Sequence, residues 1–313
     1  MSLGHYRLTI MRQNSKRLKL FVAKLKAINS PLLLETDLAI AFFETLRAEN
    51  ELHHQKEDEI KKLKTAFRRH IQLLVDFGGL EILRFDSIDA YQITLTGKLD
   101  AEQVYCCLDP FSYLSHQSAM HWHGLANRIP NTVFISHPDQ QTWRKFADEK
   151  IKAALKRDIA LFHGAKMPTY RYPKINKIQT RPINTWTSSL VGKTFYAAYK
   201  HLSDRGVRIA TIGRTFLDMV REPGLCGGMS YVRDIYMQYS NSYKDLIIQE
   251  LDTYGSKIEK VRAGYLMEQA GVSSPIIDSW AKNDASRGGS RKLDPQAEYS
   301  DHYDARWSLS IND

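Results

Sequence analysis

The sequence has no long apolar run, few cysteines and, before Glu35, no acidic residue. No stretch approaches the roughly 20 apolar residues that a membrane-spanning helix needs. The N-terminus also lacks the apolar core of a secretory signal. We therefore expect a soluble, cytoplasmic protein with no membrane partner.

The chain contains three cysteines. Cys106 and Cys107 are adjacent, so an ordinary disulfide between them would be strained, and Cys226 stands alone. No cysteine spacing is typical of a metal site, and an odd number suits a reducing compartment. The sequence therefore predicts neither a disulfide framework nor a bound metal.

Positive charge exceeds negative charge over the 313 residues. The chain has 44 Lys and Arg against 35 Asp and Glu, a formal net charge of +9 and a pI of about 9.3. This balance favours a polyanionic partner, nucleic acid first and acidic membrane second; the alternative is a merely basic soluble protein. The length predicts about two domains, and 43% hydrophobic residues are enough for two cores.

Three amphipathic helices followed by a β-hairpin are predicted in the first third of the chain. Apolar residues recur at helical spacing from Ser15 to Ile28, Thr36 and Asp37 begin a second helix, and a third runs from the charged stretch after Glu49 to Val75. Gly78-Gly79 ends the third helix. The two strands are expected over residues 80–83 and 90–95, with Asp86 to Asp89 as their turn.

This order predicts a winged helix-turn-helix domain over residues 1–98, in which a helix enters the major groove of duplex DNA and the hairpin follows the phosphates. The turn of the hairpin carries two acids, so its phosphate contacts would come from the strands. The alternative for the third helix is an ordinary solvated face. The candidate DNA-binding residues are Lys16, Arg17, Lys19, Lys61, Lys62, Lys64, Arg68, Arg69 and Arg84.

A second, larger domain of mixed α/β structure is expected over residues 99–313, which makes the whole chain α+β. Asp100 is placed to cap a short helix, and a long helix is expected from Asp139 to Phe162. Strands are expected at Tyr170–Tyr172, within residues 175–183 and over residues 307–311. Several helices fill the region after Asp218. The Gly/Ser-rich stretch from Ala285 to Ser290 is expected to be a mobile loop.

The segment from Lys166 to Arg214 is strongly basic and contains interleaved aromatic residues. Cations beside aromatic rings suit nucleic-acid backbones and exposed bases. The alternative is that the aromatics belong to an ordinary core and the cations to an ordinary surface. The aromatics in question are Tyr170, Tyr172, Trp186, Phe195, Tyr196 and Tyr199.

The stretch from Tyr113 to Ser136 predicts a short helix, a tight turn and a buried strand. Ser115 can cap the helix with its side-chain oxygen, and Gly124 can end it in a left-handed conformation. Pro130 prevents further helix, and the β-branched, apolar run over residues 132–135 predicts the strand.

This stretch and two later segments resemble the AbiEi-type antitoxins of bacterial type IV toxin–antitoxin systems. The later segments are Ile212–Asp218 with the Pro223–Gly228 turn, and Leu293-Asp294-Pro295 with Arg306-Trp307 and Ile311-Asn312. Gly213 departs from the family, which more often has an acidic residue or proline before its Arg-Thr pair. In the first stretch the matching residues are Tyr113, Ser115, Ser118, Ala119, His123, Gly124, Leu125 and Pro130.

The resemblance implies an N-terminal winged-helix domain that binds double-stranded operator DNA and represses the protein's own operon. It further implies that the C-terminal domain opposes a nucleotidyltransferase-like toxin without forming a tight, stable complex. Within such a family, Asp218 would cap a helix or pair with Arg214 one helical turn away.

No catalytic constellation emerges from the residues, and neither an enzyme nor a cofactor is predicted. His116, His121, His123 and His137 cluster in sequence, but too few can converge on one metal. Gly192-Lys193-Thr194 resembles the end of a phosphate-binding loop that lacks its earlier glycine. Ser118 has no strained nucleophile turn around it.

Two alternatives stay open. A metal-dependent nuclease would use Asp218 and Glu222, which lie one helical turn apart. A stand-alone transcriptional regulator would bind DNA without a toxin partner.

Overall fold

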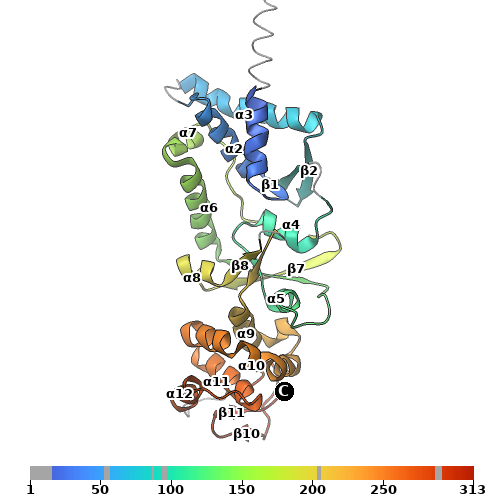
Figure 1. Ribbon diagram of the computed structural model, residues 1–313, viewed down its shortest axis with the longest axis vertical. Helices are drawn as coiled ribbons and strands as arrows, with labels where there is room; N and C mark the ends of the chain where they lie inside the picture. Colours follow the sequence, from blue (N-terminus) through green and yellow to red (C-terminus); the bar gives the residue numbers. More distant parts are fainter. Residues whose placement is uncertain (1–15, 53–56, 87, 94–96, 203–205, 286–290) are drawn as a thin grey trace, which may run out of the picture. The chain divides into compact units, whose positions relative to one another are not determined.

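The computed structural model describes residues 16–52, 57–86, 88–93, 97–202, 206–285 and 291–313 (Figure 1). The predicted loop at residues 286–290 lies outside them. The chain forms two compact units that interleave in sequence, so the units differ from the predicted division at residues 98 and 99. The first contains Met1–Phe111, Pro138–Gln179 and Asp204–Gly206, and the second contains Ser112–His137, Thr180–Ser203 and Val207–Asp313.

The first unit begins with three helices and an antiparallel sheet. Its strands lie in the order β1-β3-β2, with Leu33 opposite Tyr91 and Leu83 opposite Ala90. Strand β1 was not predicted, whereas the three helices and the hairpin were. The elements are a helix over residues 16–27, β1 (Leu32–Leu34), α2 (Glu35–Ala48), α3 (Glu57–Asp76), β2 (Leu80–Phe85) and β3 (Ile88–Ile93).

Aromatic rings form the core between these helices. The ring of Phe42 on α2 lies 6.1 Å from that of Phe21, 5.7 Å from that of Phe67 and 5.3 Å from the His70 imidazole, measured between centroids. His70 also contacts the Ala66 carbonyl oxygen at 2.7 Å through Nδ1. Burial lowers the pKa of His70, which favours the neutral imidazole in this core.

The remaining elements of the first unit include one correction. Asp100 caps α4 as predicted, because its carboxylate accepts the Gln103 N–H at 2.8 Å. The predicted continuous helix over residues 139–162 is wrong, since Lys156 adopts a φ of 53° and breaks it. The elements are α4 (Ala101–Leu108), α6 (Gln140–Leu155), the 3-10 turn η1 (Lys156–Asp158), α7 (Ile159–Gly164) and β6 (Lys177–Ile178). The strand predicted at residues 170–172 is also absent, and these residues are irregular.

The second unit contains a sheet with the strand order β7-β5-β4-β9-β8. Strand β4 pairs antiparallel with β5 and parallel with β9, which pairs antiparallel with β8. Helix α5 (His116–Trp122) follows β4 directly. The predicted Ser115 cap bond is not formed, because Ser115 Oγ lies 2.9 Å from His116 Nδ1 instead. The strands are β4 (Tyr113–Leu114), β5 (Val133–Pro138), β7 (Arg181–Ser188), β8 (Tyr199–Leu202) and β9 (Val207–Ala210).

Helices and one short strand pair form the rest of the second unit. Helix α10 is interrupted by non-helical backbone angles at Tyr243. Gly264 lies against Trp307, because a Cβ at this glycine would meet the indole ring at 2.2 Å. The elements are α8 (Gly192–Ala197), α9 (Ile212–Arg221), the 3-10 turn η2 (Pro223–Cys226), α10 (Met229–Tyr254), α11 (Lys257–Gln269), α12 (Pro275–Asn283), β10 (Tyr303–Asp304) and β11 (Leu309–Ser310).

The combination of helices with mainly antiparallel strands confirms the α+β class. Over the described residues, every helix is too short or too polar to cross a bilayer.

Candidate nucleic-acid interface

Helix α3 separates apolar and cationic side chains onto opposite faces. Leu63, Phe67, His70, Ile71 and Leu74 are buried on the inner face. The outer face carries Lys61, Lys62, Arg68 and Arg69, all exposed, and Lys64 lies half-buried at its border. The helical period of 3.6 residues produces this division. The packing of α3 on the aromatic core therefore fixes the direction in which these cations project.

Most of these cations are unpaired within the part of the chain that the structure describes. Lys61 contacts Glu57 at 2.9 Å in an exposed i, i+4 pair, which contributes little in water. Lys62, Arg68 and Arg69 have no carboxylate partner among the described residues. Three acids, Glu57, Asp58 and Glu59, occupy the first turn of α3. The cationic surface therefore lies along the middle of the helix rather than at its N-terminus.

Arg17 occupies a different environment from Lys16 and Lys19. Its Nε lies 2.5 Å from a Glu49 carboxylate oxygen, and its terminal nitrogen pairs with Glu51. Only 15% of the Arg17 side chain is exposed, whereas Lys16 and Lys19 are exposed. The ion pairs of Arg17 thus connect the first helix to the residues that follow α2.

The turn between β2 and β3 is shorter than predicted, and it carries acidic residues as predicted. Phe85 pairs with Ile88, so the turn is shorter than the predicted span from Asp86 to Asp89. The side chain of Arg84 is 82% exposed, and its Nε lies 3.7 Å from Asp89 on the facing strand. A hairpin tip that carries two acids, Asp86 and Asp89, and one cation, Arg84, attracts phosphate weakly.

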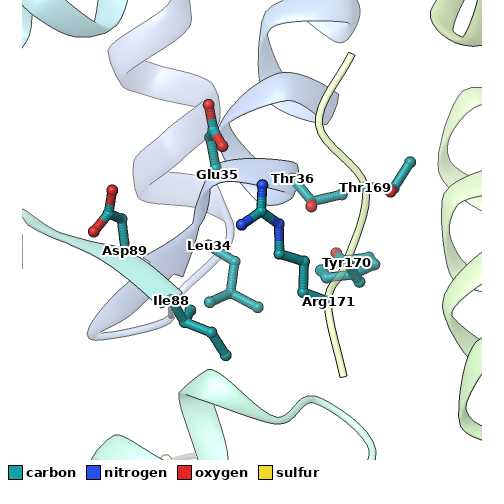
Figure 2. A pocket seen from close by; sticks show the side chains of 8 residues that line it. All are labelled: Leu34, Glu35, Thr36, Ile88, Asp89, Thr169, Tyr170 and Arg171. Atoms are coloured by element: carbon teal, nitrogen blue, oxygen red, sulfur yellow. The ribbon is translucent and has the colours of Figure 1, made fainter. Parts of the chain in front are cut away.

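A small pocket beside the hairpin is also acidic. It has a volume of about 110 Å³, and Figure 2 shows the Arg171 side chain extending from the 169–171 segment toward Glu35. Asp89 lies at another wall of this pocket. Burial, with Glu35 and Asp89 nearby, raises the pKa of Tyr91 to about 12. These carboxylates make the pocket unsuited to phosphate.

Of the six aromatics of the basic 166–214 segment, two are buried, three are half-buried and one is exposed. Phe195 is fully buried and Tyr170 is 7% exposed. Tyr199 stacks on Tyr113 with 5.1 Å between the ring centroids. Tyr196, 44% exposed, is the large hydrophobic side chain of this group that reaches the surface. Of the two interpretations, the packing favours an ordinary core over a platform for bases.

A cluster of ionic side chains lies inside the second unit. Arg214, 2% exposed, pairs with Glu250 on α10 at 2.6 Å, and Arg221 pairs with Glu259 at 2.6 Å. The predicted Arg214–Asp218 pair is therefore replaced by a partner from another helix. Burial raises the pKa of Asp218 to about 6, against the lowering effect of the two arginines.

The nuclease and metal alternatives find little support in this geometry. Asp218 lies among arginines, which repel a cation. Among the described residues, no group of three or more His, Cys, Asp or Glu side chains could hold a metal. His123 Nε2 lies 2.7 Å from the Ala210 carbonyl oxygen, and Ser118 accepts the Phe134 N–H at 3.0 Å. These two side chains thus serve the packing of β5, α5 and β9.

Sequence reasoning missed Glu250, because pairing across 36 residues of chain leaves no local pattern. It also missed a surface pocket in the second unit lined by Arg128 and Tyr231. The double-glycine turn at Gly227-Gly228 is the sequence signal from which this pocket could have been found.

No protein-family model matches the chain, and a search of curated proteins finds no match. Among solved structures, the chain is similar to the crystal structure of the RV2827C protein from Mycobacterium tuberculosis. The two share 11% sequence identity over 94% of this chain and 90% of that chain, with a TM-score of 0.47. A likeness of this degree says nothing about function.

Proposed function

We propose that this protein is a cytoplasmic, DNA-binding antitoxin that represses its own operon. The first unit binds double-stranded operator DNA through α3. The second unit opposes a nucleotidyltransferase-like toxin without a stable complex, as the resemblance to AbiEi-type antitoxins implies.

The observation that carries the DNA-binding half is the exposed cationic face of α3 within this order of elements. Helix, β1, α2, α3, β2 and β3, with the sheet order β1-β3-β2, is the order found in winged helix-turn-helix domains. In such domains the third helix enters the major groove. Lys62, Arg68 and Arg69 project from the side of α3 opposite its buried face, where they can reach phosphates.

The antitoxin half is supported by the way the resembling segments pack. Met120 and Leu125 come from the first segment, Phe216 and Cys226 from the second, and Trp307 from the third. All five belong to one buried hydrophobic cluster. Residues far apart in sequence thus contribute to a single core, as expected if the three segments define one domain.

The DNA-binding half is tested by fluorescence anisotropy with the DNA upstream of the protein's own gene. The variant Lys61→Ala/Lys62→Ala should weaken binding and reduce the slope of log K against log salt by up to about 1.8, or about 0.9 per lost phosphate contact. The matched control is Lys244→Ala/Lys257→Ala, which removes two exposed lysines of the second unit. An unchanged slope in the α3 variant would exclude this helix from the interface.

The antitoxin half is tested by growth rescue. Co-expression of the full chain with the product of the neighbouring gene should restore growth, and the α3 variant should restore it equally well. The full chain is required because residues 138–179 belong to the first unit, and a cut near residue 98 would separate them from the rest of that unit. A neighbouring product that is harmless by itself would favour the stand-alone regulator.

A further inference from the structure

A hollow of about 440 Å³ lies on the surface of the second unit. Its walls come from the start of α5, the loop after Gly124 and the first turn of α10. The lining residues are Gln117, Ala126, Asn127, Arg128, Pro130, Gly227 and Tyr231. The volume lies in the range of small-molecule sites, roughly 300–1,000 Å³. None of the lining residues is acidic.

Gly227, which lines this hollow, and the next residue, Gly228, both have a positive φ. Gly227 has a φ of 99° and Gly228 a φ of 93°. A Cβ at Gly227 would meet the Tyr231 ring at 2.7 Å and the Gln117 side-chain nitrogen at 3.3 Å. The phenol ring and the amide therefore close in on the Gly227 backbone, a position that only glycine can occupy without displacing them.

Three polar side chains around the hollow form no hydrogen bond or ion pair with other described residues. They belong to Gln117, Asn127 and Arg128. Gln117 and Tyr231 are half-buried, while Asn127 and Arg128 are exposed at the rim. Donors, acceptors and a guanidinium thus converge on one space beside an aromatic ring.

We infer that this hollow binds a nucleoside phosphate. The Tyr231 ring offers a stacking surface for a base, because every base has a π face. The amides of Gln117 and Asn127 carry the paired donor and acceptor that a base edge requires. Arg128 supplies the planar fork that binds phosphate oxygens. This site is independent of the DNA-binding and antitoxin functions proposed above.

The order of these groups gives the ligand an orientation. Asn127 and Arg128 are neighbours on the loop, and Gln117 and Tyr231 face each other across Gly227. The phosphate therefore lies at the rim beside the exposed Arg128, and the base lies on the side of the hollow formed by the half-buried Gln117 and Tyr231.

The experiment is isothermal titration of the full-length protein with AMP, GMP, CMP and UMP, and separately with inorganic phosphate. At least one nucleotide should bind saturably at one site. Arg128→Ala and Tyr231→Leu should each weaken binding by about tenfold. The matched controls, Arg144→Ala and Tyr303→Leu, change an exposed arginine and an exposed tyrosine elsewhere and should leave binding unchanged.

Several outcomes overturn the inference. They are the absence of nucleotide binding up to millimolar concentration, binding that neither pocket variant weakens, and inorganic phosphate binding as tightly as the nucleotides. Competition between duplex DNA and the nucleotide would also overturn it. Such competition would show that the nucleotide binds at the cationic face of α3 in the first unit. Arg128 is exposed on a loop, so its variant keeps the fold and the test stays decisive.

Discussion

Replacing Asp218 by asparagine should stabilise the protein at neutral pH and leave it unchanged in acid. Asp218 is 5% exposed, and its Oδ2 has no hydrogen-bond partner among the described residues. The nearby cations are engaged elsewhere, Arg214 with Glu250 and Arg221 with Glu259. The charged form of a buried carboxylate that lacks hydrogen bonds lowers the free energy of unfolding, because its lost hydration is not replaced.

The magnitude follows from the pKa of Asp218, which burial raises from 3.8 to about 6. A carboxyl whose pKa is higher in the folded protein stabilises it below the unfolded pKa and loses this contribution as pH rises through the folded pKa. About two pKa units at about 1.4 kcal/mol each give a loss of about 3 kcal/mol between pH 4 and pH 7. The asparagine side chain of the variant stays neutral over this range and should avoid the loss.

The assay is chemical denaturation of both proteins at several pH values. The two should have equal free energies of unfolding near pH 4, and Asp218→Asn should exceed the native chain by about 3 kcal/mol near pH 8. Asp245→Asn, at an exposed position of α10, is the control. A difference that stays constant with pH would refute the reasoning, because it would show that Asp218 does not change its charge in this range.

Three further predictions concern single contacts. Arg17→Ala should lower the free energy of unfolding by about 1–3 kcal/mol without changing the salt dependence of DNA binding, as measured by denaturation and anisotropy. Glu250→Gln should cost about 3–5 kcal/mol, because it leaves the buried Arg214 guanidinium unpaired, and an unaltered denaturation midpoint would contradict this. Gly264→Ala should cost about 1–3 kcal/mol and shift the near-ultraviolet circular dichroism of Trp307, which the new methyl group would displace.

The helices of the first unit could be predicted because their pattern is local. In α3 the apolar residues repeat with the helical period over 20 residues, and Gly78 ends the helix with a φ of 67°. Strand β1 was missed because its three leucines are too few to distinguish a strand from the start of α2. The break at Lys156 was missed for a related reason, since neither glycine nor proline marks it.

The candidate site was less predictable than the fold. A sequence shows which residues are cations, but not which of them meet a carboxylate in space. Arg17 and Lys62 were equal candidates, yet Arg17 pairs with Glu49 and Glu51 while Lys62 remains exposed. The partners of Arg17 lie more than 30 residues away, on a turn whose position depends on the packing of α2.

The net charge of +9 therefore gives only weak support for a nucleic-acid partner. In the second unit several arginines hold the fold together: Arg262, 8% exposed, donates to the carbonyl oxygens of Lys292 and Val220, and Arg214 lies against Glu250. Such buried cations contribute to the pI but cannot reach a phosphate. The position of the α3 cations supports a DNA partner better, because these side chains point outward and do not pack against the core. A scan of salt dependence along α3 thus tests the function directly, whereas the pI does not.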